Sequence, residues 1–229
     1  MKTLTQLLVL ILINASLFAQ KSSGKITYEI AYINFEDRGN NEDITSMLAM
    51  AKKQKYQLVF NKDCTSFTMP EVMTNEVYSE FHNVLAKNYV SFTDFYFDYK
   101  QDELLEFVKD GTLLEQKIPK LSWQITSDSK IIDKYQCYKA IYSFDYHSSR
   151  DNKTHTRVIT AWFAPSLPYS YGPKNFHGLP GLILELTENT ITFLVSKIEL
   201  SDKKSEIKIP SGRRVPKEEF EKNIIDKKL

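Results

Sequence analysis

The residue types that could do chemistry in this chain gather just before residue 178. Two tyrosines, a lysine, an asparagine, a phenylalanine and a histidine crowd into nine positions, with a tryptophan upstream: Tyr169, Tyr171, Lys174, Asn175, Phe176, His177 and Trp162. Aromatic rings interleaved with a cation and amides can form a recognition surface. The His177 imidazole could also be an acid–base group or metal ligand, because its ordinary pKa lies near neutrality. We predict a ligand or partner surface here, with a catalytic His177 as the weaker alternative.

The chain has two cysteines, Cys64 and Cys137. In an exported protein they could form a disulfide. Spacing alone does not bring their Cα atoms within bridging range, so two unpaired thiols are the alternative. Cys137 is also the second residue around which a hydrolase or metal-dependent enzyme could be built.

Motifs of established chemistry are missing from the sequence. It contains no nucleophile elbow, no HExxH, no phosphate-cradling glycine loop and no dinucleotide fingerprint. His147 and His155 flank a predicted turn, but a structural zinc site needs four ligands in close pairs. A glycosidase needs only two carboxylates that converge in space. The missing motifs therefore argue against an enzyme but do not exclude one. We predict no catalytic, cofactor-binding or metal-binding residues, and the sequence favours a non-catalytic protein.

The N-terminus is typical of a secretory signal peptide. Lys2 precedes the apolar run 7–13, and a more polar stretch follows to Ala19. The run is too short to span a bilayer. We predict cleavage of residues 1–19 and a mature chain without a transmembrane segment, exported to the periplasm or cell envelope, or secreted. Losing Lys2 takes the formal charge from +1 to zero, which gives no electrostatic reason to bind nucleic acid.

The elements that must position these residues are mostly strands. Thirteen tyrosines and fourteen phenylalanines favour strands, and alternating apolar residues predict a half-buried strand over 26–32. Helical spacing predicts a helix over 42–54 and a second one over 75–89. Further strands are expected at 55–61, 64–69, 92–100, 103–109, 112–118, 121–127, 131–146, 155–164, 182–186 and 190–200.

Short strands joined by turns imply a mainly β (α+β) fold. We expect a curved antiparallel meander sheet or partial barrel with one or two short covering helices, because a long sheet must curl to limit its edges. Asp110-Gly111 indicates a type I′ hairpin turn. One domain should span 20–212, with a polar C-terminal helix or tail over 213–229.

A glycine- and proline-rich corner precedes the apolar run Leu182-Ile183-Leu184. It reads Gly178, Leu179, Pro180, Gly181, Leu182, Ile183. The glycines can adopt backbone angles closed to other residues, and the proline fixes φ between them. We interpret the corner as a rigid connection that feeds a buried strand. A loop held open for a ligand is the alternative.

With these residues in view, 121–186 resembles the GLPGLI family. The resemblance rests on several motifs in order: Trp123-Gln124-Ile125, Lys134-Tyr135-Gln136-Cys137-Tyr138-Lys139-Ala140, Ala161-Trp162-Phe163-Ala164-Pro165, Gly172-Pro173 and the Gly178–Ile183 corner. Lys134 stands where the family commonly has glycine, which puts the geometry of that turn in question. The resemblance implies a secreted protein of the Bacteroidetes type, often encoded near outer-membrane receptors, and no established activity.

Three functions remain open at this stage. The first is a non-catalytic accessory protein that binds an outer-membrane receptor or another envelope protein. The second is a carrier for an apolar or lipid-like ligand in a concave β cavity. The third is a hydrolase or metal-dependent enzyme using His177 or Cys137. A hollow interior would favour the carrier, whereas a packed one leaves the outer surface for binding.

Overall fold

The computed structural model describes residues 21–33, 42–70, 80–91, 93–148 and 151–226. These residues form one 12-stranded sheet and three helices. The strands are β1 (Ser23–Ile33), β2 (Lys55–Asn61), β3 (Cys64–Thr68), β4 (Asp94–Asp98), β5 (Glu103–Phe107), β6 (Thr112–Lys117), β7 (Gln124–Ile132), β8 (Tyr135–Ser148), β9 (Lys153–Ala164), β10 (Leu182–Glu188), β11 (Ile191–Ser201) and β12 (Arg213–Pro216). The helices are α2 (Glu42–Lys53), α3 (Glu80–Val90) and α4 (Lys217–Asp226). The predicted signal peptide lies outside the described residues.

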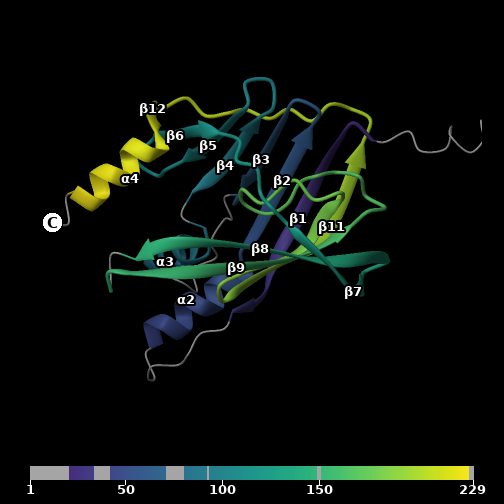
Figure 1. Cartoon of the computed structure of the whole chain (residues 1–229), viewed down its shortest axis with the longest axis horizontal. Coiled ribbons are helices and arrows are strands. Elements are labelled where there is room, and N and C mark those ends of the chain that lie inside the picture. The colour runs from purple at the N-terminus through teal and green to yellow at the C-terminus, as the bar shows by residue number, and fades with distance from the viewer. Residues whose placement is uncertain (1–20, 34–41, 71–79, 92, 149–150, 227–229) are drawn as a thin grey trace, which may run out of the picture.

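The sheet is an open, curved meander, which confirms the predicted fold class. Its strand order is β12-β6-β5-β4-β3-β2-β1-β11-β10-β9-β8-β7, antiparallel except for the β12–β6 pair. Register shifts interrupt the β1–β11, β9–β10 and β7–β8 ladders, and such bulges bend strands. In Figure 1 the β8–β9 hairpin consequently crosses in front of β1, β2 and β11.

The connection from Pro165 to Gly181, here called the interior loop, fills the curve of the sheet. Its apolar side chains belong to the main core: Leu167, Tyr169, Phe176 and Leu179. They meet rings from distant strands, because Phe60 of β2 lies 4.7 Å from Tyr169, and Trp123 lies 6.3 Å from Phe176 between ring centroids. Figure 1 shows this loop between the crossing layers. The interior at these positions is therefore packed.

Two helices cover part of the core. α2 packs against β1 and α3, and it contributes Met50 and Ala51 to the main core, while α3 contributes Ala86 and Val90. The helix predicted over 42–54 is thus confirmed. The second helix begins at Glu80 in the described part of the chain. In that part, the helices are all too short or too polar to cross a membrane.

The segment from Asp202 to Gly212, here called the strap, lies on the other face of β4–β6. Strands alternate their side chains between faces, so Phe97 of β4 joins the main core whereas Tyr96 joins a separate cluster. Ile207 and Ile209 of the strap pack on that cluster. The chain then adds β12 beside β6 and ends in α4. The segment 213–229, predicted as a helix or tail, thus also contributes a strand to the sheet.

Two turns differ from the sequence predictions. The β5–β6 hairpin forms, but the type I′ assignment is wrong: Gly111 has φ +82°, Asp110 does not have a positive φ, and Val108 donates its N–H to the Thr112 carbonyl. The turn is therefore longer than two residues. The β7–β8 turn lies at Asp133-Lys134 rather than after residue 127. Asp133 takes φ +55°, so the turn closes without the family glycine.

Candidate functional site

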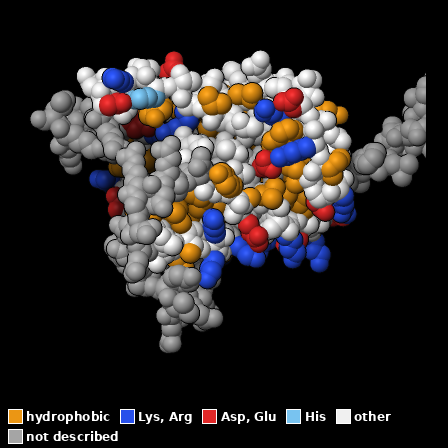
Figure 2. Space-filling view, turned by 90° about the horizontal axis from the view of Figure 1, so that it is seen from below, with side chains coloured by type: hydrophobic (Ala, Val, Ile, Leu, Met, Phe, Trp, Pro, Cys, Tyr) orange, Lys and Arg blue, Asp and Glu red, His pale blue; other side chains and the backbone are white. Residues whose placement is uncertain are grey.

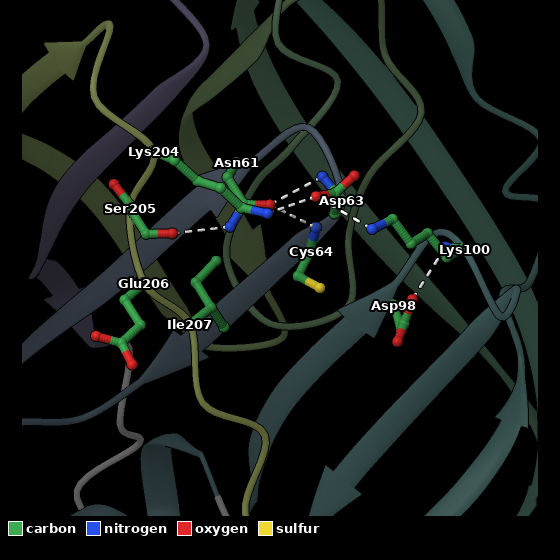
Figure 3. Close-up of a pocket in the computed structure, with 9 residues that line it drawn as sticks. All are labelled: Asn61, Asp63, Cys64, Asp98, Lys100, Lys204, Ser205, Glu206 and Ile207. Carbon is green, nitrogen blue, oxygen red and sulfur yellow. Dashed lines mark hydrogen bonds and ion pairs between the residues drawn. The ribbon is translucent and has the colours of Figure 1, made fainter.

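Three polar segments meet at one end of the sheet. In a meander of antiparallel strands, alternate turns lie at the same end, so the β2–β3 and β4–β5 turns are neighbours. The strap passes beside them and closes a cavity of about 400 Å³, here called the aspartate lobe. Figure 3 shows its lining: Asn61, Asp63, Cys64, Asp98, Lys100, Lys204, Ser205, Glu206 and Ile207.

Asn61 is the buried residue that joins the turn to the strap. Its Oδ1 accepts the backbone N–H groups of Asp63 (2.8 Å) and Cys64 (2.9 Å). Its Nδ2 donates to the Ser205 carbonyl at 2.8 Å. An asparagine side chain commonly closes such a turn on its own backbone. Both the oxygen and the nitrogen of the Asn61 amide are hydrogen-bonded within the protein. Asn61 therefore shapes the cavity and has few hydrogen-bonding sites left for a ligand.

Asp63 is held between two lysines from different segments. Its Oδ2 lies 2.7 Å from Lys204 Nζ of the strap and 3.4 Å from Lys100 Nζ of the β4–β5 turn. The hydrogen bond from Lys204 and the charge of Lys100 lower the pKa of the Asp63 carboxyl. Asp63 is therefore a carboxylate at neutral pH and a structural anchor, which makes it a poor proton donor.

Asp98 and Cys64 contribute a further carboxylate and a thiol to the lining of this lobe. Asp98 Oδ1 accepts the backbone N–H groups of Lys100 (2.9 Å) and Gln101 (3.2 Å), which fixes the turn. Burial raises the pKa of the Cys64 thiol, and the charges of Asp98 and Asp63 raise it further. Because the thiolate is the nucleophile, this cysteine is poorly reactive at neutral pH.

A second cavity, of about 340 Å³, also has Asn61 in its lining and is here called the tyrosine lobe. It lies on the side of the interior loop, whereas the aspartate lobe lies on the side of the strap. Its lining is Lys21, Ser22, Phe60, Asn61, Lys62, Tyr169 and Tyr171. Tyr169 donates its hydroxyl to the Lys21 carbonyl at 3.2 Å. The Tyr171 ring lies 5.0 Å from Phe60 and 5.8 Å from Tyr99 between centroids, so an aromatic wall supports this lobe. We call the two lobes together the Asn61 groove.

The residues predicted as a binding surface do not form one patch. Tyr169 and Tyr171 line the tyrosine lobe, whereas Phe176 is buried in the core. Trp162 on β9 has Lys130 Nζ 4.3 Å from its ring centroid and alternates with the buried Phe163. A ligand- or partner-binding role of these residues stays a prediction.

The other polar members of that prediction also have structural surroundings. Lys174 forms an ion pair with Glu188, and both side chains are largely covered. Asn175 is half-buried in the interior loop. The His177 ring lies 5.1 Å from Phe97, edge to face, and its backbone carbonyl accepts the Trp123 Nε1–H at 2.8 Å. Burial lowers the pKa of His177, so the imidazole is neutral at pH 7.

The glycine- and proline-rich corner Gly178–Ile183, here called the signature corner, leads into the buried strand that its sequence predicted. Leu179, Leu182 and Ile183 are almost fully covered. Gly178 has φ +88°, and a Cβ on Gly181 would lie 2.3 Å from the Ala164 carbonyl oxygen. The exposed Pro180 lies between these glycines. These contacts agree with a structural interpretation of the corner.

The two cysteines are unpaired. Cys64 begins β3 and is half-buried, whereas Cys137 is buried in β8, and five strands separate the two in the sheet order. The structure thus holds two free thiols, the alternative to the disulfide. Burial raises the pKa of Cys137 to about 11, which keeps it protonated. No group of three or more histidine, cysteine or acidic side chains in the described ranges is arranged to hold a metal ion.

Sequence reasoning missed most of the groove. The acids and lysines of its lining are spread between Lys21 and Glu206 and share no motif, although the strands predicted over 55–61 and 64–69 imply a turn between them. The available signal was topological. In a predicted meander, the turns after β2 and β4 belong to the same end, so their polar residues could have been grouped. The strap had no such signal, because it carries no regular structure.

The fold and the groove define a β scaffold with two cavities at one end of its sheet, and comparisons with solved structures agree with the fold. Residues 145–185 match a family described as a protein of unknown function (Porph_ging). That segment contains the whole Gly178–Ile183 corner, so the match is consistent with the predicted resemblance to a GLPGLI-type family of unknown function. No curated protein matches the sequence.

Solved structures show the same fold at low identity. The chain is similar to PNGF-II in two crystal forms, C2 and P21, with TM-scores of 0.53 and 0.52 and 15% identity in each. The alignments cover 89% and 90% of this chain but 32% and 33% of those chains. This chain thus spans about a third of the length of the PNGF-II chains, and the likeness concerns the fold alone.

Proposed function

We propose that this protein is a non-catalytic, extracytoplasmic binding protein of the bacterial cell envelope, and that it receives a segment of a partner protein in the Asn61 groove. The observation that carries the proposal is the groove itself: two cavities at one end of the sheet that share Asn61 and have hydrogen-bonding groups and an aromatic wall. Such a mixture of polar groups and rings suits recognition. The export and envelope location rest on the signal peptide predicted over 1–19 and on the family resemblance.

The chemistry of the groove supports binding over catalysis. Its Asp63 carboxylate is neutralised by Lys204 and Lys100, and its Cys64 thiol has a raised pKa. A general base needs a pKa near the working pH, and a nucleophile needs activation. Neither group meets these requirements. An outer-membrane receptor or another envelope protein is the partner class that the resemblance suggests.

The two alternatives find less support. A carrier needs a hollow interior, but the interior loop fills the curve of the sheet with Leu167, Phe176 and Leu179. An enzyme built on His177 or Cys137 would need that group activated. Instead, the imidazole lies against Phe97 and the thiol has a pKa of about 11.

Site-specific photo-crosslinking in the native host tests the proposal. A photoreactive amino acid replaces Lys62 in the groove in one strain and the exposed Lys197 of β11 in a matched control strain. We expect a discrete adduct with an envelope protein from position 62 and none from position 197. The absence of an adduct at both positions, or the same adducts at both, would count against the groove as the partner site.

A further inference from the structure

A second cluster of charges lies at the end of the sheet opposite the Asn61 groove. Ser23 at the start of β1 pairs with Asn61, whereas Ile33 at the end of β1 pairs with Ile191. Ile191 in turn pairs with Glu188, the last residue of β10. Glu188 is therefore separated from the groove by the length of β1. Figure 2 shows acidic and basic side chains beside a histidine at the end of the molecule where the β8–β9 hairpin turns.

Two cations share the Glu188 carboxylate. Lys174 of the interior loop forms a close ion pair with Glu188 Oε2, and both side chains are largely covered. Arg157 of β9 lies farther away, with its Nη1 3.8 Å from Glu188 Oε1. That distance is too long for a hydrogen bond. Two positive charges thus face one negative charge, and Lys174 holds the carboxylate more closely than Arg157 does.

The Arg157 guanidinium has no hydrogen-bond partner within the described part of the chain. Its Nε is buried, but the side chain as a whole is 30% exposed, so the two Nη groups are open to solvent. A guanidinium carries five N–H donors, and a buried donor without a partner is rare in native proteins. The donors on the open edge of Arg157 are therefore available to a bound group.

Aromatic rings hold this guanidinium in place. Its central carbon lies 4.6 Å from the centroid of the Tyr146 ring and 6.0 Å from that of Phe144, both on β8. Phe144 is the direct neighbour of Arg157 in the β8–β9 ladder, so the sheet sets the position of the cation. Such contacts favour arginine in particular, because its planar group stacks on rings. A side chain that is already oriented loses less entropy when it binds a ligand.

The other acid of this hairpin has a partner of its own. His155 Nε2 donates to Asp151 Oδ2 at 2.7 Å, and about two-fifths of the Asp151 side chain is exposed. Among the described side chains, Asp151 is not an ion-pair partner of Arg157. The positive charge of Arg157 is thus shared only with the carboxylate that Lys174 already neutralises.

We infer that the Arg157 guanidinium is a binding site for a carboxylate group, separate from the Asn61 groove. Two N–H groups on one edge of a guanidinium match the two oxygens of a carboxylate. The single surplus positive charge of the cluster also matches one negative charge. A phosphate group carries more than one charge at neutral pH and would be repelled more strongly by Glu188. The site is therefore expected to prefer a carboxylate to a phosphate.

NMR of the protein with isotope-labelled arginine tests the inference, because the Nε–H signal of Arg157 reports directly on the guanidinium. At constant ionic strength, sodium acetate and a capped Ala-Glu-Ala peptide should both shift this signal saturably. Sodium chloride should not, and inorganic phosphate should bind more weakly than acetate. The ratio of the two carboxylate affinities distinguishes the sources: tighter binding of the peptide indicates a polypeptide ligand, and tighter binding of acetate a small acid.

Variants assign the binding to the guanidinium. Arg157→Lys keeps the charge but loses the paired donors, so acetate binding, followed at the amides of 155–159, should weaken about fivefold, the value of one hydrogen bond. Glu188→Gln removes the competing carboxylate and should tighten acetate binding about threefold. Arg213→Lys, at an exposed position of β12, is the matched control and should leave the affinity unchanged.

Equal effects of acetate and chloride, or no saturable shift of the Arg157 signal, would overturn the inference. So would tighter binding of phosphate than of acetate, or an unchanged acetate affinity in Arg157→Lys. If that variant fails to fold, Glu188→Gln still decides, because an arginine with a purely structural role binds acetate in neither protein. These outcomes are independent of the proposed function, which the crosslink from position 62 tests.

Discussion

The two faces of the sheet are covered by segments of opposite character. The interior loop fills the inner face with buried rings and leucines, and its arms bond to each other through Leu182 N–H to Leu167 O and Ile183 N–H to Tyr171 O. The strap covers the outer face of β4–β6 with two isoleucines. It is held by ion pairs of Asp202 and Lys204 and by hydrogen bonds from Ser22, Ser23 and Asn61 to its carbonyls. Buried apolar contacts have no charge that salt could screen or pH could titrate. Exposed ion pairs, by contrast, are weakened by salt.

This difference indicates where the molecule is rigid and where it can yield. The interior loop bridges β2, β4 and the residue before β7, so its loss would separate the two ends of the curve. The strap forms one wall of the aspartate lobe. A binding site that lies between a rigid core and a weakly held segment can adjust to an occupant without cost to the fold. Four experiments test the contrast.

The largest effect is expected from the core of the interior loop. Phe176 is 5% exposed and packs against Trp123. Phe176→Ala should lower the free energy of unfolding by about 3–5 kcal/mol, the usual result of removing a buried aromatic ring. Chemical denaturation measures it. Ser170→Ala, at an exposed position of the same loop, is the control. If both variants changed stability equally, the loop would not be the anchor of the fold.

The next effect concerns the signature glycines. A Cβ at residue 181 would overlap the Ala164 carbonyl, where backbone would have to move. Gly181→Ala should therefore cost about 2–3 kcal/mol. At Gly178 there is space, but φ is +88°, so Gly178→Ala should cost about 1 kcal/mol. Urea midpoints compare the two, and a neutral Gly181→Ala would contradict the close approach.

Acidification should release the strap and spare the interior loop. The folded-state pKa of Asp63 lies below its ordinary value because of Lys204 and Lys100. Its contribution is therefore complete above the ordinary carboxyl range and is lost as the pH falls through the lowered pKa. NMR shifts of 203–206 should titrate at acid pH while those of 165–168, the part of the interior loop far in sequence from the titrating His177, stay constant. In Asp63→Asn the strap titration should disappear; if it persisted, another carboxyl would hold the strap.

The smallest effect is expected at the sheet edge. Arg214 of β12 contacts Glu103 (3.0 Å) and Glu115 (3.2 Å), and about half of its side chain is exposed. Arg214→Gln should cost about 0.2–1 kcal/mol, the range of exposed pairs, and should weaken amide protection in β12 selectively. Added salt should reduce the difference between wild type and variant. A loss as large as that of Phe176→Ala would mean that the edge, too, is a structural centre.

Much of the fold followed from local patterns. The alternation of Ile26, Tyr28 and Ile30 placed β1, and all three side chains are buried as the pattern requires. The apolar run after the signature corner placed β10. The turn chemistry was less certain. Asp133 closes the β7–β8 turn with a positive φ, which aspartate adopts more readily than most residues other than glycine.

The candidate site was harder to predict for a physical reason. The aromatic residues before residue 178 are close together in the sequence, which suggested one binding surface. In the folded chain, however, Phe176 is buried in the core and Lys174 forms an ion pair with Glu188. Tyr169 and Tyr171, by contrast, line the tyrosine lobe. Composition reports which groups could bind a ligand, but the direction of each side chain depends on the strands packed around it.

The sequence by itself determined most of the strands, the helix over 42–54, the β-rich class and the buried corner, because each depends on the spacing of neighbouring residues along one segment. Only the tertiary structure decided that the interior is filled and that Asn61, Asp63, Asp98 and Lys204 meet. These contacts join residues far apart in the chain, and they depend on how strongly the bulged sheet curves and on the path that an irregular strap takes across its end.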